Sequence, residues 1–382
     1  MKSNYDLLGN HIRLIDNRNK DLVTEQVLGI NIDKFFMPSV ANVIGTDLSK
    51  YKLIQKGNFA CNPMHVGRDE RLPVALYSED TPAIVSPAYF MFEIKDATVL
   101  NADFLMMWFR RPEFDRICWL HTDGSVRGGI TWEDICRMEI PVPPIDEQIE
   151  IVSSYQAITE RIKLKKQIND NLEAQALALF SDFVSQHNEK WEQGKLGDVI
   201  SSANTGGDAI QKVPIVDYDT GIKCARVGDI TNAREFASWA FCSATNSVFD
   251  NYKLQAGDIL VTRTATLGIT QYIPSDISAV YNNGLIRLKT DNNRALPLYV
   301  YWAINTSDFM NYINQMNSAT SVRPNMKIDY LLNYQLLIPP IEKQIQFVKA
   351  VEVLMNAISL NNNERLKLCD FQSTLLNTLS RR

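Results

Sequence analysis

Two short segments of the sequence combine arginines with small polar residues that form hydrogen bonds through their side chains. They read CNPMHVGRDER (residues 61–71) and VTRTATLG (residues 261–268). Arginine donates two parallel hydrogen bonds to guanine O6 and N7, asparagine pairs with adenine N6 and N7, and threonine accommodates either. Because both segments are rich in turn residues, we expect their polar side chains to be exposed. The candidate DNA contacts are Asn62, Arg68, Arg71, Arg263, Thr264 and Thr266.

The arginines admit a second interpretation. Asp69 and Glu70 lie between Arg68 and Arg71, so surface ion pairs are an equally good interpretation of these charges. Arg127 and Arg323 each end a Ser-Val-Arg tripeptide. They are candidates to contact phosphate, or to hold their loop against the base of the following helix, and the sequence leaves both roles open.

The sequence lacks the motifs of enzymes that bind ATP or methylate amino groups. It has no G-x-x-x-x-G-K-[ST] loop for ATP phosphates and no N-P-P-[YF] or D-P-P-[YF] motif of an amino-methyltransferase. The nearest string, Asn62-Pro63-Met64, lacks the second proline and the aromatic residue. Acidic residues are plentiful, but most are expected on the solvated surface and not in a catalytic pair. We predict a chain without a catalytic site.

The composition restricts the class of protein further. The 6 cysteines and 4 histidines are scattered without a C-x-x-C pair, which predicts reduced thiols and no metal site. No apolar run reaches the roughly 18 residues of a membrane span, and no signal peptide is evident, so we expect a cytoplasmic protein. The net charge of −5 argues against gripping nucleic acid by charge alone. Local arginines would then read DNA while partners supply most of the phosphate contacts.

An internal repeat organises the chain. PPIDEQI begins at Pro143 and PPIEKQI begins at Pro339, 196 residues later. The Ser-Val-Arg tripeptides have the same spacing, and Gly57 matches Gly257 at a spacing of 200. A period this long indicates a duplicated domain, with a pseudo-twofold arrangement like that of a dimer.

Each copy ends in a predicted long helix. Residues 145–183 and 341–382 contain neither proline nor glycine, and prolines precede both stretches, where a helix tolerates them. The predicted domains are a globular domain, a helix, a second globular domain and a second helix, at residues 1–141, 142–186, 187–337 and 338–382.

Both helices carry a stripe at heptad spacing that suits a coiled-coil seam. Its pairing residues are Ile151, Ile158, Ile162, Asn169, Leu172, Leu179, Leu354, Ile358, Asn361, Leu368 and Leu375. We predict that the helices pair antiparallel, with Asn169 facing Asn361 at the centre. This register also sets Lys165 against Arg365, a repulsive pair. The alternative is that each helix packs only on its own globular domain.

The globular parts have the pattern of a mixed α/β fold with many short strands. Apolar, β-branched and aromatic runs predict strands at residues 83–85, 90–94, 258–262 and 285–288. Short helices are predicted at residues 102–111 and 297–314, and residues 187–200 are expected to form a polar linker.

The repeated arrangement resembles the specificity subunit of a type I restriction–modification enzyme. The features that match are Gly257-Asp258-Ile259-Leu260, the Ser-Val-Arg loops, and the prolyl-prolyl motif that opens each helix. The first copy departs in reading Gly57-Asn58, and the second has Lys343 where the first has Glu147. The resemblance covers essentially the whole chain, and its specificity lies in the duplication.

The resemblance implies a non-catalytic subunit that recognises double-stranded DNA. Each globular half would be a target-recognition domain for one part of a bipartite target, and the two helices would set the spacer. The implied partners are two methyltransferase subunits and the endonuclease/translocase subunits. S-adenosylmethionine and ATP with magnesium would bind to those partners, with no cofactor in this chain. The alternative is a two-headed protein-interaction scaffold that does not bind DNA, which would suit the acidic composition.

Overall fold

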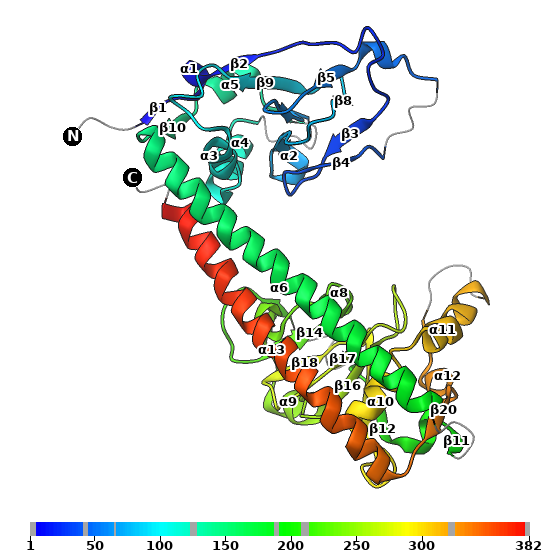
Figure 1. The fold of residues 1–382 in the computed structure, drawn as a ribbon. Coiled ribbons are helices and arrows are strands. Elements are labelled where there is room, and N and C mark those ends of the chain that lie inside the picture. The colour runs from blue at the N-terminus through cyan, green and yellow to red at the C-terminus, as the bar shows by residue number, and fades with distance from the viewer. Residues whose placement is uncertain are drawn as a thin grey trace. The chain divides into compact units, whose positions relative to one another are not determined.

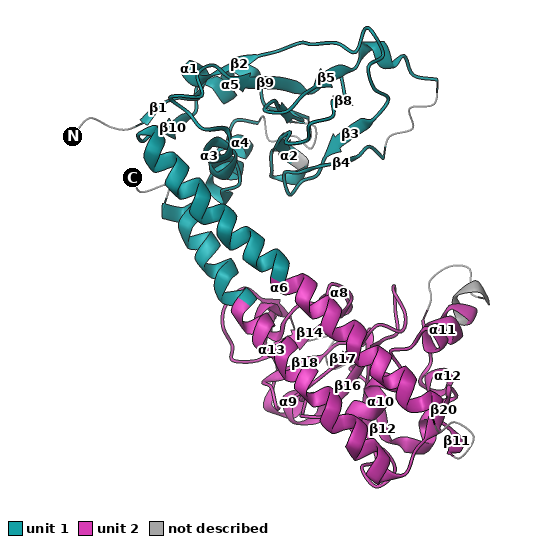
Figure 2. Ribbon diagram, viewed as in Figure 1, with its two compact units in different colours: residues 1–164, 365–382 teal, residues 165–364 magenta. Residues whose placement is uncertain are grey.

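The computed structural model describes residues 5–40, 45–64, 66–122, 128–186, 191–207, 214–319 and 325–378. They form two compact units, one of Met1–Leu164 with Arg365–Arg382 and the other of Lys165–Glu364 (Figure 2). Two long helices, α6 (Ile145–Ser185) and α13 (Ile341–Thr378), contribute a part to each unit (Figure 1). None of the described helices is long and apolar enough to cross a membrane.

The first unit contains three small sheets, with strand orders β1-β10, β2-β9-β6-β7 and β4-β3-β8-β5. The strands are β1 (Tyr5–Leu7), β2 (Ile12–Leu14), β3 (Val27–Ile30), β4 (Phe36–Pro38), β5 (Lys52–Ile54), β6 (Phe59–Cys61), β7 (Val74–Leu76), β8 (Ala83–Val85), β9 (Phe90–Ile94) and β10 (Glu139–Pro141). Between them lie α1 (Leu8–His11), α2 (Val66–Asp69), α3 (Ala102–Phe109), α4 (Pro112–Leu120) and α5 (Trp132–Cys136).

The main core of this unit lies between the β2-β9-β6-β7 sheet and α3. The Asn101 side chain accepts a hydrogen bond from Phe104 N and caps this helix, whose residues from Phe104 to Phe109 are all buried. The rings of Phe59 and Phe92 stack at 5.0 Å, and Phe109 meets both edge-on. Burial of these large rings fixes the sheet and helix against each other.

The second unit repeats the pattern with sheets β11-β20, β12-β19-β16-β17 and β13-β15-β14-β18. The strands are β11 (Glu192–Lys195), β12 (Ile200–Thr205), β13 (Ile215–Val216), β14 (Lys223–Ala225), β15 (Phe241–Cys242), β16 (Ile259–Thr262), β17 (Thr270–Tyr272), β18 (Ala279–Tyr281), β19 (Leu285–Thr290) and β20 (Gln335–Ile338). The helices are α8 (Val227–Thr231), α9 (Asn246–Tyr252), α10 (Pro297–Ala303), α11 (Ser307–Ala319) and α12 (Ile328–Leu332).

Two of the three sheets correspond strand for strand between the units. In the third, β3 and β8 pair parallel as β14 and β18 do, and β4 corresponds to β15. Among the described strands, the sheet orders differ only at the edge of that sheet, because β5 joins beside β8 whereas β13 joins beside β15. The predicted duplication is therefore present in the fold, and the mixed α/β class is confirmed.

Within each unit, α6 and α13 pack antiparallel on each other and also on the globular part. In the first unit Val152 and Tyr155 belong to the core that Leu375 also contacts. In the second unit the core includes Ala176, Phe180, Phe347 and Val351. The two alternatives for the helices are thus combined, since each helix pairs with the other and also covers a core.

The predicted seam is wrong near the end of α6. Leu179 is 42 % exposed, and Phe180, one position later, is buried. A straight α-helix has 3.6 residues per turn, so a strict heptad pattern drifts round its surface unless the helices supercoil over their full length. At this end of α6, the side chain that is buried is the one that faces the core of the second unit, Phe180.

Two other predictions of local structure need correction. Residues 187–200 were expected to be a linker, but within the described part β11 pairs with β20, and Leu196 and Val199 are fully buried. The helix predicted at 297–314 is two helices, α10 and α11, which are interrupted after Ala303. The pairing partner of β11 lies 140 residues away in sequence, which local pattern does not show.

The glutamine of each prolyl-prolyl motif fixes a long helix to its unit. Gln148 is fully buried; its Nε2 donates to Val99 O and Pro143 O, and its Oε1 accepts from Asn101 N. Gln344 is equally buried and makes the same set of bonds with Arg294 O, Pro339 O and Leu296 N. In both units the accepted N–H belongs to the residue that precedes a core helix, α3 or α10. The repeated glutamine therefore has a structural reason.

Candidate nucleic-acid interface

The two segments with candidate DNA contacts occupy equivalent loops of the two units. The first joins β6 to β7, and the second joins β16 to β17. In each loop a backbone carbonyl accepts a hydrogen bond from the segment that follows a Ser-Val-Arg tripeptide. Ile130 N donates to Pro63 O at 3.2 Å, and Met326 N donates to Arg263 O at 2.8 Å. Each unit thus brings both sequence-predicted segments to one place, although Arg127 and Arg323 themselves lie outside the described residues.

In the first unit the β6–β7 loop contains the short helix α2. Arg71 Nη1 lies 3.0 Å from Asp33 Oδ1, and both side chains are exposed. Asn62 uses its Oδ1 to accept from Met64 N, which shapes the turn and leaves its Nδ2 without a described hydrogen bond. The side chain of Arg68 lies outside the described part of the structure. The ion-pair interpretation thus holds for Arg71, with Asp33 as partner instead of the neighbouring acids.

In the second unit Arg263 is held by neutral acceptors. Its Nε donates to Met326 O at 3.1 Å, and its Nη1 donates to Asn283 O and Oδ1, both at 3.2 Å. Thr264 forms an isolated bridge with Asn325, while Thr266 is exposed at the loop tip. Arg263 therefore holds the β16–β17 loop against Met326 and Asn283, a role that its neighbours in the sequence did not predict.

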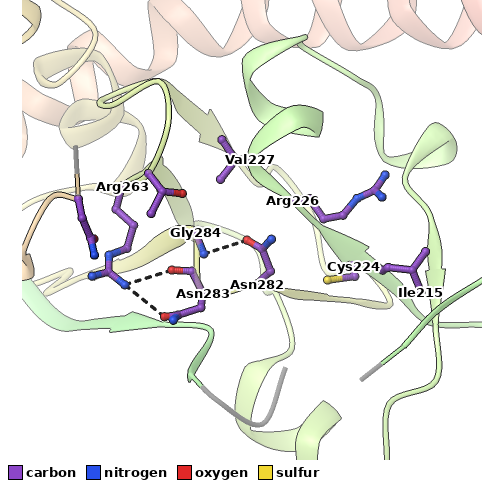
Figure 3. Close-up of a pocket in the computed structure, with 10 residues that line it drawn as sticks. Ile215, Cys224, Arg226, Val227, Arg263, Asn282, Asn283 and Gly284 are labelled. Atoms are coloured by element: carbon purple, nitrogen blue, oxygen red, sulfur yellow. Dashed lines mark hydrogen bonds between the residues drawn. The ribbon is translucent and has the colours of Figure 1, made fainter. Parts of the chain in front are cut away.

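A pocket of about 410 Å³ opens beside this loop (Figure 3). It is lined by Ile215, Cys224, Arg226, Val227, Arg263, Thr264, Asn282, Asn283, Gly284 and Asn325. Figure 3 shows the Asn282-Asn283-Gly284 turn between Arg263 and the wall formed by Cys224 and Ile215. Neither these asparagines nor Arg226 is among the contacts predicted from the sequence. An Asn-Asn-Gly string is a turn signal, but nothing local shows that the β18–β19 turn lies beside the β16–β17 loop.

A buried carboxylate orders the arginines beside this pocket. Asp229, only 1 % exposed, accepts from Arg226 Nε at 3.0 Å and from Arg234 Nη1 at 3.2 Å. The hydrogen bond to Asp229 raises the pKa of Arg226 above its ordinary value, so the guanidinium remains charged. Two cations share one carboxylate, and the group keeps a positive charge.

The first unit has a pocket of a different kind, about 660 Å³ in volume. Its charged lining balances four basic residues against four acidic ones: Lys34, Arg71, Arg110, Arg116, Asp33, Asp69, Glu70 and Asp115. Lys34 is buried, and its Nζ contacts Asp115 Oδ1 at 2.7 Å and Phe109 O at 2.6 Å. Burial lowers the pKa of this lysine despite the neighbouring carboxylate. Because the acidic and basic residues of this pocket balance one another, we do not interpret it as a binding site for an anion.

The helix pair shows how the predicted polar layer is arranged. Asn361 Nδ2 donates to Asn169 Oδ1 at 3.0 Å, and Asn169 Nδ2 donates to Asn362 Oδ1 at 2.6 Å. Lys165 Nζ lies 2.7 Å from Glu364 Oε2, so an acid of α13 compensates the charge that was expected to meet Arg365. In the first unit Gln372 Nε2 donates to Thr159 Oγ1 at 2.7 Å.

No group of three or more His, Cys, Asp or Glu side chains suited to a metal ion occurs among the described residues. The six cysteines are free thiols, and four of them are buried. Burial raises the pKa of Cys61 and Cys118 above the ordinary thiol value, which disfavours the reactive thiolate.

The chain thus consists of two similar α/β units in tandem, and each unit includes segments of the long helices α6 and α13. Residues 188–368 match the family described as "Type I restriction modification DNA specificity domain" and belong to that family. DNA recognition is the role of this family, which is not catalytic, and the family predicted from the sequence is confirmed. No curated protein matches the chain.

A solved structure extends the likeness of fold to nearly the whole chain. The S subunit of a type I restriction–modification system from M. genitalium is 16 % identical, with 98 % of this chain and 95 % of that one covered and a TM-score of 0.55. At this identity the match shows the fold. The HsdS subunit from Thermoanaerobacter tengcongensis is 15 % identical over 98 % of this chain and 95 % of that one, with a TM-score of 0.37.

Proposed function

We propose that this chain is the specificity subunit of a type I restriction–modification complex and reads a bipartite DNA target. The observation that carries the proposal is the repeated sheet order combined with different loops. The β6–β7 connection of the first unit and the equivalent β16–β17 connection of the second differ. The first contains the short helix α2 with both acidic and basic residues, whereas the second is shorter and has Arg263 as its one charged residue. Because base-edge contacts specify sequence, two different loop surfaces favour two different half-sites.

The long helices suit a second role, the docking of two methyltransferase subunits. In the second unit Ile168, Val353 and Leu360 are 44 %, 68 % and 70 % exposed on α6 and α13. In the first unit Leu164 and Phe371 are 49 % and 55 % exposed on the same helices. Exposed apolar side chains on helices favour a protein partner. Those partners would bind S-adenosylmethionine, endonuclease/translocase subunits would use ATP and magnesium, and the complex would act in the cytoplasm.

Methylation-sensitive sequencing of the host genome, with and without this gene, tests the function. We expect one split adenine-methylation motif to disappear when the gene is deleted and to return on complementation. If every split motif persists in the deletion strain, the chain is not a specificity subunit, and a protein-interaction scaffold becomes the better account.

A domain exchange tests whether each unit reads its own half-site. Residues 187–337 would be replaced by the same domain of a relative with a different target. We expect one half-site to change, while the other half-site and the spacer length stay the same. A change in both half-sites would contradict independent reading by the two units.

A further inference from the structure

The pocket beside the β16–β17 loop offers hydrogen-bond donors whose acceptor partners are missing from the described structure. Asn282 Oδ1 accepts from Gly284 N at 3.1 Å, and Asn283 Oδ1 accepts from Arg263 Nη1 at 3.2 Å. Neither Nδ2 group makes a hydrogen bond to a described residue. Each asparagine Oδ1 therefore already accepts one hydrogen bond inside the protein, while the Nδ2 group is available to donate.

The charge at this pocket is positive and fixed in place. The hydrogen-bond partners of Arg263 are carbonyl and amide oxygens, which leave its charge uncompensated. On the other side, Arg226 and Arg234 share the single carboxylate of Asp229. Of the described residues that line the pocket, none is acidic. This is a local exception in a chain of net charge −5, and it contrasts with the balanced pocket of the first unit.

We infer that this pocket binds one backbone phosphate of the DNA, contacted by Arg263, Asn282 and Asn283. The inference rests on the proposed DNA-binding function and adds the chemical group and the residues. Two amide donors beside an arginine, in a pocket with no acidic residue among the described lining, match the oxygens of a phosphodiester.

Base reading fits the same atoms less well. Adenine recognition needs the Oδ1 and the Nδ2 of one asparagine together, but each Oδ1 already accepts an internal hydrogen bond, so an adenine would have to share it. Bidentate recognition of guanine needs two free N–H groups of one arginine fork, whereas Nε and Nη1 of Arg263 are engaged. A phosphate oxygen needs only one N–H group from each of Arg263, Asn282 and Asn283, so the internal hydrogen bonds of these residues can remain.

The test uses Asn283→Asp in the full-length chain. The aspartate keeps an oxygen to accept from Arg263 Nη1, so the fold is preserved, but it removes the Nδ2 donor and adds negative charge. Asn292→Asp is the matched control, because this exposed asparagine also accepts a hydrogen bond through Oδ1, from Thr290, and lies beyond the far end of β19. Asn282→Asp is a second variant that retains the bond from Gly284.

Binding of fluorescent duplexes would be titrated over a range of salt concentrations, with one duplex that carries the methylation motif and one with that motif shuffled. We expect Asn283→Asp to weaken binding roughly tenfold on both duplexes. The slope of log K against log salt should become shallower by about 0.9, the value for one phosphate contact. Asn292→Asp should bind like the wild type.

Each other outcome has a distinct meaning. If the wild-type chain binds neither duplex, either alone or with its methyltransferase subunits added, the proposed function and the pocket inference both fail. If the wild type binds but both asparagine variants bind equally well, the pocket inference alone fails. A loss confined to the motif duplex, with an unchanged salt slope, would show a base contact and overturn the phosphate assignment.

Discussion

The two units share a framework but differ at buried positions 196 residues apart. Val85 and Met91 are fully buried in the first unit, where they belong to one apolar cluster. The second unit has Tyr281 and Arg287 at these places, with the Arg287 guanidinium 5.3 Å from the centre of the Tyr281 ring. Because Tyr281 and Arg287 are in contact, substitutions at these two positions are expected to have coupled effects on stability.

The turn that precedes β6 and β16, in contrast, has kept its geometry in both units. Gly57 and Gly257 adopt φ values of 88° and 87°, which glycine tolerates without strain. Asn58 Oδ1 accepts from Gln55 N, and Asp258 Oδ2 accepts from Gln255 N. The side chain changes between amide and carboxylate, but the acceptor oxygen remains. The geometry of a turn is therefore preserved where loops and core packing have changed.

The register of α6 and α13 gives the largest expected effect, a difference in disulfide formation between two pairs of engineered cysteines. In a Cys136→Ser, Cys369→Ser background, which leaves only buried native thiols, Asn169→Cys with Asn361→Cys should form a disulfide readily. Asn169→Cys with Leu354→Cys, one heptad away, should not, because about 10 Å of helix separates the two positions on α13. The disulfide is measured by gel mobility under mild oxidation. Equal rates for the two pairs would refute the Asn169–Asn361 register.

The two buried glutamines test whether the units are equivalent. Gln148→Leu and Gln344→Leu each leave two carbonyls and one N–H group without a buried partner. We expect each change to lower the free energy of unfolding by about 3–5 kcal/mol, measured by denaturant unfolding. The exposed Gln156→Leu and Gln346→Leu are matched controls on the same helices. A large loss at only one glutamine would break the comparison.

Much of this framework was predictable because it depends on local pattern and repetition. The strands at residues 83–85 and 90–94 have the predicted bounds, and both long helices begin directly after their prolines. Strand β11 was missed because its four residues are stabilised by pairing with β20. Sequence periodicity reports burial on one element, and it does not identify a distant pairing partner.

The candidate site was less predictable for a related reason. Arg263 was selected by residue type, but its role depends on carbonyls of Asn283 and Met326, which any residue at those positions would supply. Backbone acceptors leave no trace in the side-chain sequence. The pocket was missed because its asparagines come from a different turn, which the sheet order brings beside the β16–β17 loop.

The arginines of the two loops should therefore differ in their effect on stability. Arg263→Met removes hydrogen bonds to three acceptor atoms in a half-buried position, and should lower the free energy of unfolding by about 1–2 kcal/mol. Arg71→Met removes an exposed ion pair with Asp33 and should change it by less than about 0.5 kcal/mol. Denaturant unfolding of both variants measures the difference. Equal losses would mean that the loops are fixed in the same way.

The divergent core pair, Tyr281 and Arg287, gives a small expected effect in the opposite direction, a gain in stability. The Tyr281 hydroxyl is buried, and no described residue forms a hydrogen bond with it. Tyr281→Phe removes this unsatisfied group, so we expect the free energy of unfolding near neutral pH to rise by about 1 kcal/mol. Burial also raises the pKa of Tyr281 from 10.0 to about 12.

That shift sets the pH dependence. Above pH 10.0 the unfolded chain loses the phenolic proton that the folded chain retains up to about pH 12. The wild type therefore loses stability as the pH rises through this window, whereas Tyr281→Phe does not lose this contribution. The advantage of the variant should widen in alkali, as measured by urea unfolding at neutral and alkaline pH. Tyr218→Phe, with a tyrosine that is 60 % exposed, is the control and should show neither effect. A variant less stable than the wild type at neutral pH would mean that the hydroxyl is stabilised in solution, and that the tyrosine–arginine pair is a favourable replacement for valine and methionine.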